Sequence, residues 1–238
     1  MKTIHPLPPA GYSPLSQGES QLLPTKWPHR QYIILPPLAG GLGRGPHNMT
    51  IRPATISDAP FIALVIAEAL GDDIMERCQE SISEQDGQRL ALLADSIRQD
   101  STLYSWRHTS IAQDTNGTPL GAIVAYPADN YMQMRATTFA MLSDLISFDV
   151  ESMDAEARPG EYYVDSIAVV PKARGQGIAR QLLLHSIAKA QEMLLPAILA
   201  CEPNNLGAKA LYESLGFSHD GDLFIFGHHY LRMERTER

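Results

Sequence analysis

The spacing of hydrophobic and polar residues predicts alternating strands and helices from about residue 50 onward. The sharpest pattern lies in residues 162–194, where aromatic and β-branched residues predict a strand that ends before Pro171. A turn containing Gly175 and Gly177 follows, and a helix is predicted after it. The apolar face of this helix comprises Ala179, Leu183, Ile187, Ala190 and Leu194.

Weaker patterns predict the remaining elements. Further strands are expected at 50–52, 103–111, 119–126, 197–201, 217–226 and 229–233. Helices are expected from a cap at Thr55 or Ser57 to residue 70, and at 83–99, 131–148 and 206–215. Asn116–Gly117 predicts a hairpin turn, while residues 71–81 fit either a loop or a helix.

Residues 1–48 differ in composition from the rest of the chain. They hold 9 of the 17 prolines and 6 of the 17 glycines. Such a segment buries too little apolar surface to offset its ordering entropy, so we expect it to be mostly disordered and residues 49–238 to form the domain. The segment is interpreted either as a transit peptide or docking arm, or as dispensable, including the case in which translation starts at Met49.

Charge and composition exclude several classes of function. The chain has a formal net charge of -8 and residues 1–48 carry +3, so residues 49–238 carry -11 without a basic patch, which argues against nucleic-acid binding. The chain has no long apolar run and no signal-peptide pattern, so neither a membrane nor secretion is indicated. Cys78 and Cys201 lack metal-ligand spacing and suit a reducing compartment as buried apolar residues, which predicts a cytoplasmic protein.

The glycine turn before the helix has the chemistry of an anion site. Backbone N–H groups at a helix start lack partners within the helix, and Gly175 and Gly177 let the backbone approach a bulky anion. The turn lacks the Gly-Lys-Ser/Thr ending of a nucleotide triphosphate loop. Arg180 also stands where a dinucleotide fingerprint requires its third glycine. A turn without a ligand is the alternative interpretation.

Two motifs resemble the GCN5-related N-acetyltransferase (GNAT) superfamily. The first is the acyl-CoA pyrophosphate loop, matched by Arg174, Gly177 and Ala179. The second is Asn-x-x-Ala-x-x-Leu-Tyr-x-x-x-Gly-Phe, which starts at Asn205 and ends at Phe217. The resemblance covers about residues 49–235. It implies an α/β (α+β) fold in which helices flank a mixed, mostly antiparallel sheet and acyl-CoA enters between the fourth and fifth strands.

By this resemblance, acetyl-CoA is the co-substrate and no metal is required. The implied contacts with acetyl-CoA are Ile167, Val169, Arg174, Gly175, Gln176, Gly177, Ile178, Ala179, Asn205 and Tyr212. The loop N–H groups are expected to bind the pyrophosphate, and the Arg174 side chain to add positive charge. Backbone groups of Val169 are expected to pair with the pantetheine arm, with its N–H facing the thioester oxygen.

Two residues are candidates for proton transfer. Tyr212 matches the family tyrosine near the CoA sulfur, and a core tyrosine is the alternative interpretation. Asp165 is the candidate base, and simple alternation places it on the same face as Ile167 and Val169; a structural aspartate is the alternative. The family glutamate of the fifth strand is replaced here by Ala200, and the nearby Glu202 lies close to the strand end.

The implied function is transfer of an acetyl group to a primary amine by direct attack in a ternary complex. A non-catalytic acyl-CoA-binding regulatory module is the alternative. The acceptor, a small amine or a protein amine, is left open, as is a homodimer of the kind common in the family. Residues 127–160 exceed a minimal family domain, so a methionine-rich helix there is either a substrate-selecting wall or ordinary core packing. His228 and His229 are expected to be surface residues.

Overall fold

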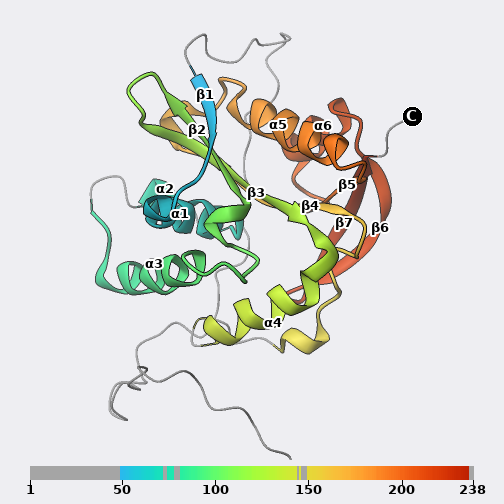
Figure 1. Ribbon diagram of the computed structural model, residues 1–238, viewed down its shortest axis with the longest axis horizontal. Coiled ribbons are helices and arrows are strands. Elements are labelled where there is room, and N and C mark those ends of the chain that lie inside the picture. The colour runs from blue at the N-terminus through green and yellow to red at the C-terminus, as the bar shows by residue number, and fades with distance from the viewer. Residues whose placement is uncertain (1–48, 72–73, 78–80, 144, 146–148, 236–238) are drawn as a thin grey trace, which may run out of the picture.

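The computed structural model describes residues 49–71, 74–77, 81–143, 145 and 149–235. A seven-stranded sheet carries helices on both faces (Figure 1). The strand order is β1-β2-β3-β4-β5-β7-β6, and only the β4–β5 pair is parallel. The predicted mixed, mostly antiparallel sheet is therefore confirmed. The expectation for residues 1–48 lies outside the described residues.

The strands follow the predicted β-branched runs closely. They are β1 (Met49–Pro53), β2 (Thr109–Asp114), β3 (Pro119–Pro127), β4 (Tyr162–Val169), β5 (Ala197–Cys201), β6 (Ser218–Ile225) and β7 (His228–Arg235). The strand predicted from residue 103 is wrong in its first half, because a 3₁₀ turn at Trp106–His108 precedes β2. The Ser105 side chain caps this turn by accepting from the Arg107 N–H at 3.3 Å.

The helices also follow the sequence, with shorter limits. They are α1 (Ala59–Ala69), α2 (Ile74–Arg77), α3 (Glu84–Ile97), α4 (Tyr131–Met141), α5 (Ile178–Glu192) and α6 (Leu206–Ser214). Ser83, expected as the first residue of the helix at 83–99, is the N-cap of α3 and accepts from the Asp86 N–H at 3.1 Å. Thr55 caps a 3₁₀ turn that leads into α1, so the helix itself starts later than predicted. The predicted extension of α4 to residue 148 lies partly outside the described residues.

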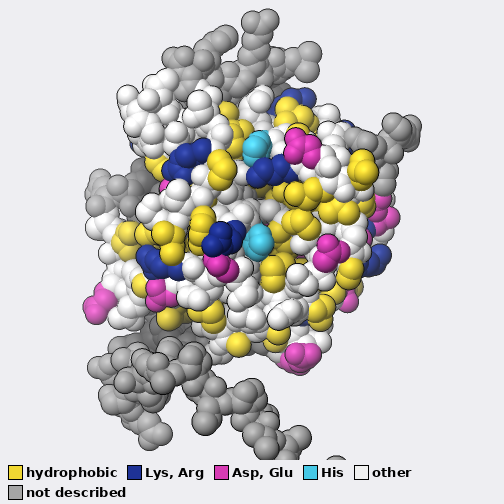
Figure 2. Space-filling model, in the orientation of Figure 1, with side chains coloured by type: hydrophobic (Ala, Val, Ile, Leu, Met, Phe, Trp, Pro, Cys, Tyr) yellow, Lys and Arg dark blue, Asp and Glu magenta, His cyan; other side chains and the backbone are white. Residues whose placement is uncertain are grey.

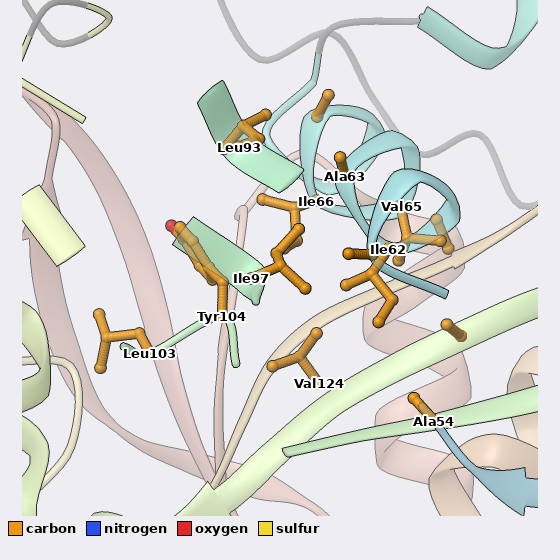
Figure 3. Close-up of a cluster of buried hydrophobic side chains, with 14 of the residues drawn as sticks. Ala54, Ile62, Ala63, Val65, Ile66, Leu93, Ile97, Leu103, Tyr104 and Val124 are labelled. Carbon is orange, nitrogen blue, oxygen red and sulfur yellow. The ribbon is translucent and has the colours of Figure 1, made fainter. Parts of the chain in front are cut away.

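One core lies between the sheet and the α1–α3 side of the molecule. Ile62 and Ile66 of α1 are fully buried and share this core with Ile97 of α3 and Val124 of β3. Figure 3 shows these side chains pointing toward one another between the helices and the strand. Burial of such apolar side chains is the main stabilising contribution to this layer.

A second core lies on the opposite face, under α5 and α6. Leu183 and Ile187 belong to it, as the helical spacing predicts. Leu194 was expected on the same helix face, and this prediction is wrong: α5 ends at Glu192, and Leu194 has φ 57° and is 87% exposed. The spacing misled because Leu194 belongs to the chain reversal that follows the helix, where the Leu195 N–H donates to the Ala190 carbonyl.

Helix α4 contributes side chains to two hydrophobic clusters. Its Met134 is buried, whereas Met132 is 58% and Met141 39% exposed. Phe139 packs in a third cluster with Tyr230 of β7 and other residues of the β6–β7 hairpin. The methionines of this segment therefore divide between core packing and an exposed surface, and the substrate-selecting wall stays a prediction.

Surface charge, possible membrane spans and possible metal ligands all bear on the class of function. Figure 2 shows lysine and arginine side chains interspersed with acidic and apolar ones on the face in view. No helix within the described ranges is long and apolar enough to cross a membrane. In that same part of the chain, no three His, Cys, Asp or Glu side chains form a group that could hold a metal ion. His228 and His229 are exposed as expected, and Cys201 is buried; Cys78 lies outside the described residues.

A close contact between β3 and β4 predicts a stability effect at Gly121. A Cβ atom added there would lie 2.7 Å from the Ala168 carbonyl oxygen and 3.2 Å from the Val169 Cα. Because backbone atoms cannot rotate away, we expect Gly121→Ala to destabilise the fold by about 1–3 kcal/mol in urea unfolding. Gly87→Ala is the matched control. Gly87 lies within α3, and a Cβ atom added there would meet only the Ile82 side chain, at 3.9 Å, so this change should raise the free energy of unfolding by up to ~1 kcal/mol. Equal stability of Gly121→Ala and the wild type would contradict the close contact.

Candidate active site

The parallel strands β4 and β5 separate after a short paired segment. Their register pairs Tyr162 with Ala197 and ends at Val164 opposite Leu199. Beyond that point β4 pairs only with β3, and β5 pairs only with β7. The sheet is therefore split on one side of its centre, between the last residues of β4 and of β5.

Backbone polar groups of β4 face this split. The Val170 N–H donates to the Leu120 carbonyl at 2.9 Å, which makes these two residues a hydrogen-bonded antiparallel pair. Because hydrogen-bonded and non-hydrogen-bonded pairs alternate, Val169 opposite Gly121 and Ile167 opposite Ile123 turn their N–H and C=O groups away from β3. Val169, predicted to pair with the pantetheine arm, and Ile167, predicted to contact acetyl-CoA, thus present backbone groups to the split.

A small, partly open cleft lies beside the end of β4. Its lining residues are Glu68, Ile167, Ala168, Val169, Arg174, Ala179, Leu183 and Leu211. Four of the predicted cofactor-binding residues are among them: Ile167, Val169, Arg174 and Ala179. The cleft brings together α1, β4, the glycine turn, α5 and α6, which are far apart in the sequence.

The glycine turn leads directly into the first turn of α5. Gly175 and Gly177 have φ values of 74° and 80°, a left-handed conformation that favours glycine. Gly177 is the N-cap residue, so the N–H groups of Ile178, Ala179 and Arg180 have no acceptors within the helix. The first turn of α5 carries no acidic residue. This terminus therefore has the open donors and positive dipole end that suit an anion.

The other predicted loop residues lie around this terminus. Gly175 and Gln176 are exposed, and the Gln176 side chain donates to the Lys172 carbonyl at 3.4 Å. The Ile178 side chain is buried in the core under α5, so only its backbone faces outward. The loop thus contributes main-chain groups rather than a set of polar side chains.

The Arg174 side chain is held by protein groups on three sides. Its Nη2 lies 2.5 Å from Glu68 Oε1 and its Nη1 lies 2.6 Å from Glu76 Oε1. Its Nε donates to the Val169 carbonyl at 3.1 Å. The guanidinium predicted to add charge at the phosphates is therefore paired with two carboxylates. Sequence reasoning missed Glu68, although a single acidic residue in the apolar run of α1 was the available signal.

Asp165 lies at a β-bulge in β4. The register changes there, because Val124 faces Ser166 while the adjacent Ala125 faces Val164. Asp165 Oδ2 accepts from the Tyr126 hydroxyl at 2.6 Å, and Oδ1 accepts from the Ser166 hydroxyl at 2.8 Å. Tyr126 belongs to the core on the α1 side. The prediction that Asp165 shares a face with Ile167 and Val169 is therefore wrong, since the extra residue shifts the alternation.

Buried aromatic residues surround the far side of Asp165. Burial raises the pKa of Tyr126 well above its usual value, and the negative charge of Asp165 raises it further. Tyr163, whose ring centroid lies 6.0 Å from that of Tyr126, donates to Glu156 at 2.5 Å. Burial also lowers the pKa of His108, whose ring is tilted 49° against that of Tyr126, to about 4, which keeps its imidazole neutral at pH 7. Asp165 thus accepts from the protonated Tyr126 hydroxyl on this side.

Tyr212 lies on the buried side of α6. Its ring packs edge-on against Phe217 with centroids 6.1 Å apart, and 8% of its surface is exposed. Burial is the larger cause that raises its pKa above the usual value, and the neighbouring Cys201 is the smaller one. The preceding residue, Leu211, lines the cleft. Tyr212 itself is not among the residues that line the cleft, and it keeps its proton at neutral pH.

Asn205 and Glu202 lie between β5 and α6. The Asn205 side chain accepts from the Ala208 N–H at 3.1 Å and so caps α6. Glu202 Oε1 accepts from the Tyr230 hydroxyl at 3.2 Å. Both side chains are half-buried at the end of β5, where the strand has separated from β4.

Comparison with known proteins assigns a class to this arrangement. The family model of the acetyltransferase (GNAT) family matches residues 71–217, which is more than half of the chain. The chain therefore belongs to the GNAT family and is an acetyltransferase of this type, which confirms the resemblance based on the two motifs. A search of the curated proteins finds no match.

Solved structures support the same class. The crystal structure of an acetyltransferase is 27% identical, with a TM-score of 0.62, and the match covers 79% of this chain and all of the other. An N-acetyltransferase from Staphylococcus aureus Mu50 is 20% identical with a TM-score of 0.61, covering 78% of this chain and 99% of the other. A protein described as histone acetyltransferase HPA2 and related acetyltransferase, from Corynebacterium glutamicum, is 23% identical with a TM-score of 0.54, covering 80% and 97%. These last two show the fold alone.

Proposed function

We propose that the protein transfers an acetyl group from acetyl-CoA to a primary amine by direct attack within a ternary complex. The observation that carries this proposal is the split between β4 and β5, with the open start of α5 beside it. A strand edge that presents the Ile167 main chain and the Val169 N–H next to an anion site fits a ligand with an amide-containing arm and a pyrophosphate.

The chain offers distinct groups to the two parts of acetyl-CoA. The pyrophosphate is received by N–H groups of the turn from Gly175 to Ala179, at the positive end of α5; the Arg174 N–H of the expected set instead donates to the Pro171 carbonyl at 3.2 Å. The pantetheine arm pairs with the main chain of Ile167 and Val169, in the position that another strand would take. Asn205 and Tyr212, at the start of α6 and within it, complete the proposed contacts.

The chemical step needs a neutral amine and a stabilised leaving group. The amine lone pair attacks the thioester carbonyl carbon, and the oxyanion is stabilised by the Val169 N–H. Asp165 accepts the proton that the amine loses, directly or through water. The C–S bond then breaks, and the Tyr212 hydroxyl donates a hydrogen bond or its proton to the departing thiolate. The products are an acetylated amine and free CoA.

The acceptor is best described by its charge. Residues 49–238 carry a formal charge of -11, which attracts a cationic amine such as a small polyamine or a protein lysine. The amine must then lose one proton before it attacks, and accepting this proton is the role proposed for Asp165.

A cytoplasmic location is proposed from the reducing environment that the free Cys201 suits, and fractionation of native cells tests it.

A thermal melt with acetyl-CoA tests the proposed binding site. A ligand at about 100 times its Kd stabilises the native state by ~2.7 kcal/mol. We expect the melting temperature to rise by several degrees, at about 2–4 °C per kcal/mol for a domain of this size. Thiol release from acetyl-CoA with a panel of amines then identifies the acceptor. Unchanged melting with saturating acetyl-CoA, succinyl-CoA and CoA would remove the assignment of the site, whereas tight binding without thiol release would favour a regulatory module.

A further inference from the structure

Glu68 is a buried carboxylate in the wall of the cleft. Its side chain is 6% exposed, and it lies on α1 among apolar neighbours. Both of its oxygens are used: Oε1 contacts Arg174 Nη2 at 2.5 Å, and Oε2 accepts from the Met75 N–H at 3.0 Å. Glu68 thus connects α1, the start of α2 and the first residue of the glycine turn.

We propose that Glu68 is a positioning residue for the acyl-CoA site, which holds the Arg174 side chain as a fixed link between α1 and the end of β4. The link orients the turn so that its N–H groups, rather than the guanidinium, receive the pyrophosphate. This inference rests on the proposed function, since it assigns the pyrophosphate to the same turn.

The geometry of Arg174 favours a fixed link. Its guanidinium places Nε on the Val169 carbonyl, Nη2 on Glu68 and Nη1 on Glu76. A planar guanidinium with donors in three directions is fixed by three such acceptors, whereas a lysine ammonium is a single point charge on a flexible chain. The start of the turn is therefore held at a set position relative to β4 and α1.

The charges around Arg174 also argue against a direct role at the phosphates. One guanidinium faces two carboxylates, so the group is not a net positive centre that attracts an anion. The two glutamates differ in burial: the Glu68 side chain is 6% exposed and the Glu76 side chain is 53% exposed. Loss of a buried partner leaves an uncompensated charge, while exposed pairs contribute little. Glu76 is therefore a matched control for Glu68 on the same arginine.

Calorimetric titration with CoA tests this inference without requiring catalysis. We expect Glu68→Gln to raise the Kd for CoA by about tenfold or more, and Glu76→Gln to change it by less than about twofold. Arg174→Lys keeps the positive charge at a partly exposed position and removes the three-way contact, so it should weaken CoA binding about as much as Glu68→Gln. In an Arg174→Gln background, Glu68→Gln should have little further effect, because its partner is already absent.

An acyl donor without a pyrophosphate separates positioning from damage to the fold. With S-acetylpantetheine as donor, kcat/KM should be nearly the same for the wild type and Glu68→Gln, whereas with acetyl-CoA it should fall. Equal losses with both donors would assign the effect to the fold. Full CoA affinity in Arg174→Lys, or tighter CoA binding in Glu68→Gln, would overturn the inference. Either result would indicate that the positive charge at position 174 interacts with the phosphates directly. Absence of CoA binding by the wild type would instead overturn the proposed function itself.

Discussion

Asp165→Asn is expected to lower kcat/KM for acetyl transfer by about 10²–10⁴-fold, with CoA affinity nearly unchanged. The reason is chemical, because an amide of the same size cannot take the proton that the amine must lose. The carboxylate has two hydroxyl donors, Tyr126 at 2.6 Å and Ser166 at 2.8 Å, which orient it within the bulge of β4. Steady-state rates from thiol release across a range of pH measure the effect, and the loss of rate at low pH should flatten in the variant.

Tyr126→Phe is the matched control for this prediction. Burial raises the pKa of Tyr126, so its hydroxyl stays protonated and donates to Asp165 rather than accepting from it. A hydrogen bond to an ionised carboxylate favours the ionised form, and its removal makes protonation easier. Activity in Tyr126→Phe should therefore be kept at high pH and lost at a higher pH than in the wild type as the solution is acidified. Wild-type kcat/KM in Asp165→Asn would make Asp165 a structural residue.

The sequence was informative where the pattern is local. The runs that form β4 and β5 are dense in β-branched and aromatic residues, and the two strands were placed within one residue of their observed limits. The glycine turn at 175–177 and the helix at 206–215 are predictable for the same reason, since their signals lie within a few residues. Local side-chain chemistry therefore predicted the parts that surround the proposed CoA site.

The sequence was misleading where pairing across the sheet decides the outcome. The side on which Asp165 lies depends on one extra residue in the β3–β4 ladder, and strict alternation has no means of detecting it. The contact between Glu68 and Arg174 joins residues 106 positions apart, so no motif contains both. Such long-range contacts set the direction of the charged groups in the site, which is why the role of the Arg174 side chain was the least predictable part.

Tyr212→Phe is expected to lower kcat by about 10²-fold while CoA affinity is largely kept. The phenylalanine ring preserves the packing against Phe217 and loses only the hydroxyl, so stability should change little. A typical thiol has a pKa of about 8.5, and burial raises the pKa of Tyr212 above its usual value of about 10. The Tyr212 hydroxyl therefore stays protonated under conditions in which the departing thiol is a thiolate. The hydroxyl therefore stabilises the thiolate as the C–S bond breaks, and its absence should affect kcat and kcat/KM alike.

The raised pKa also determines how this loss depends on pH. The Tyr212 hydroxyl is protonated below its pKa, which lies above the range in which the enzyme is assayed, so the wild type should show no loss of rate at pH 8–9 from this residue. Tyr212→Phe should then lower the rate by a constant factor across pH. Tyr162→Phe is the control, because this tyrosine is also buried and its hydroxyl is hydrogen-bonded within the core, to the Ala125 carbonyl at 3.4 Å and to the Ser186 side chain. An equal loss in both variants would assign the effect to core packing, and an unchanged kcat in Tyr212→Phe would remove Tyr212 from the mechanism.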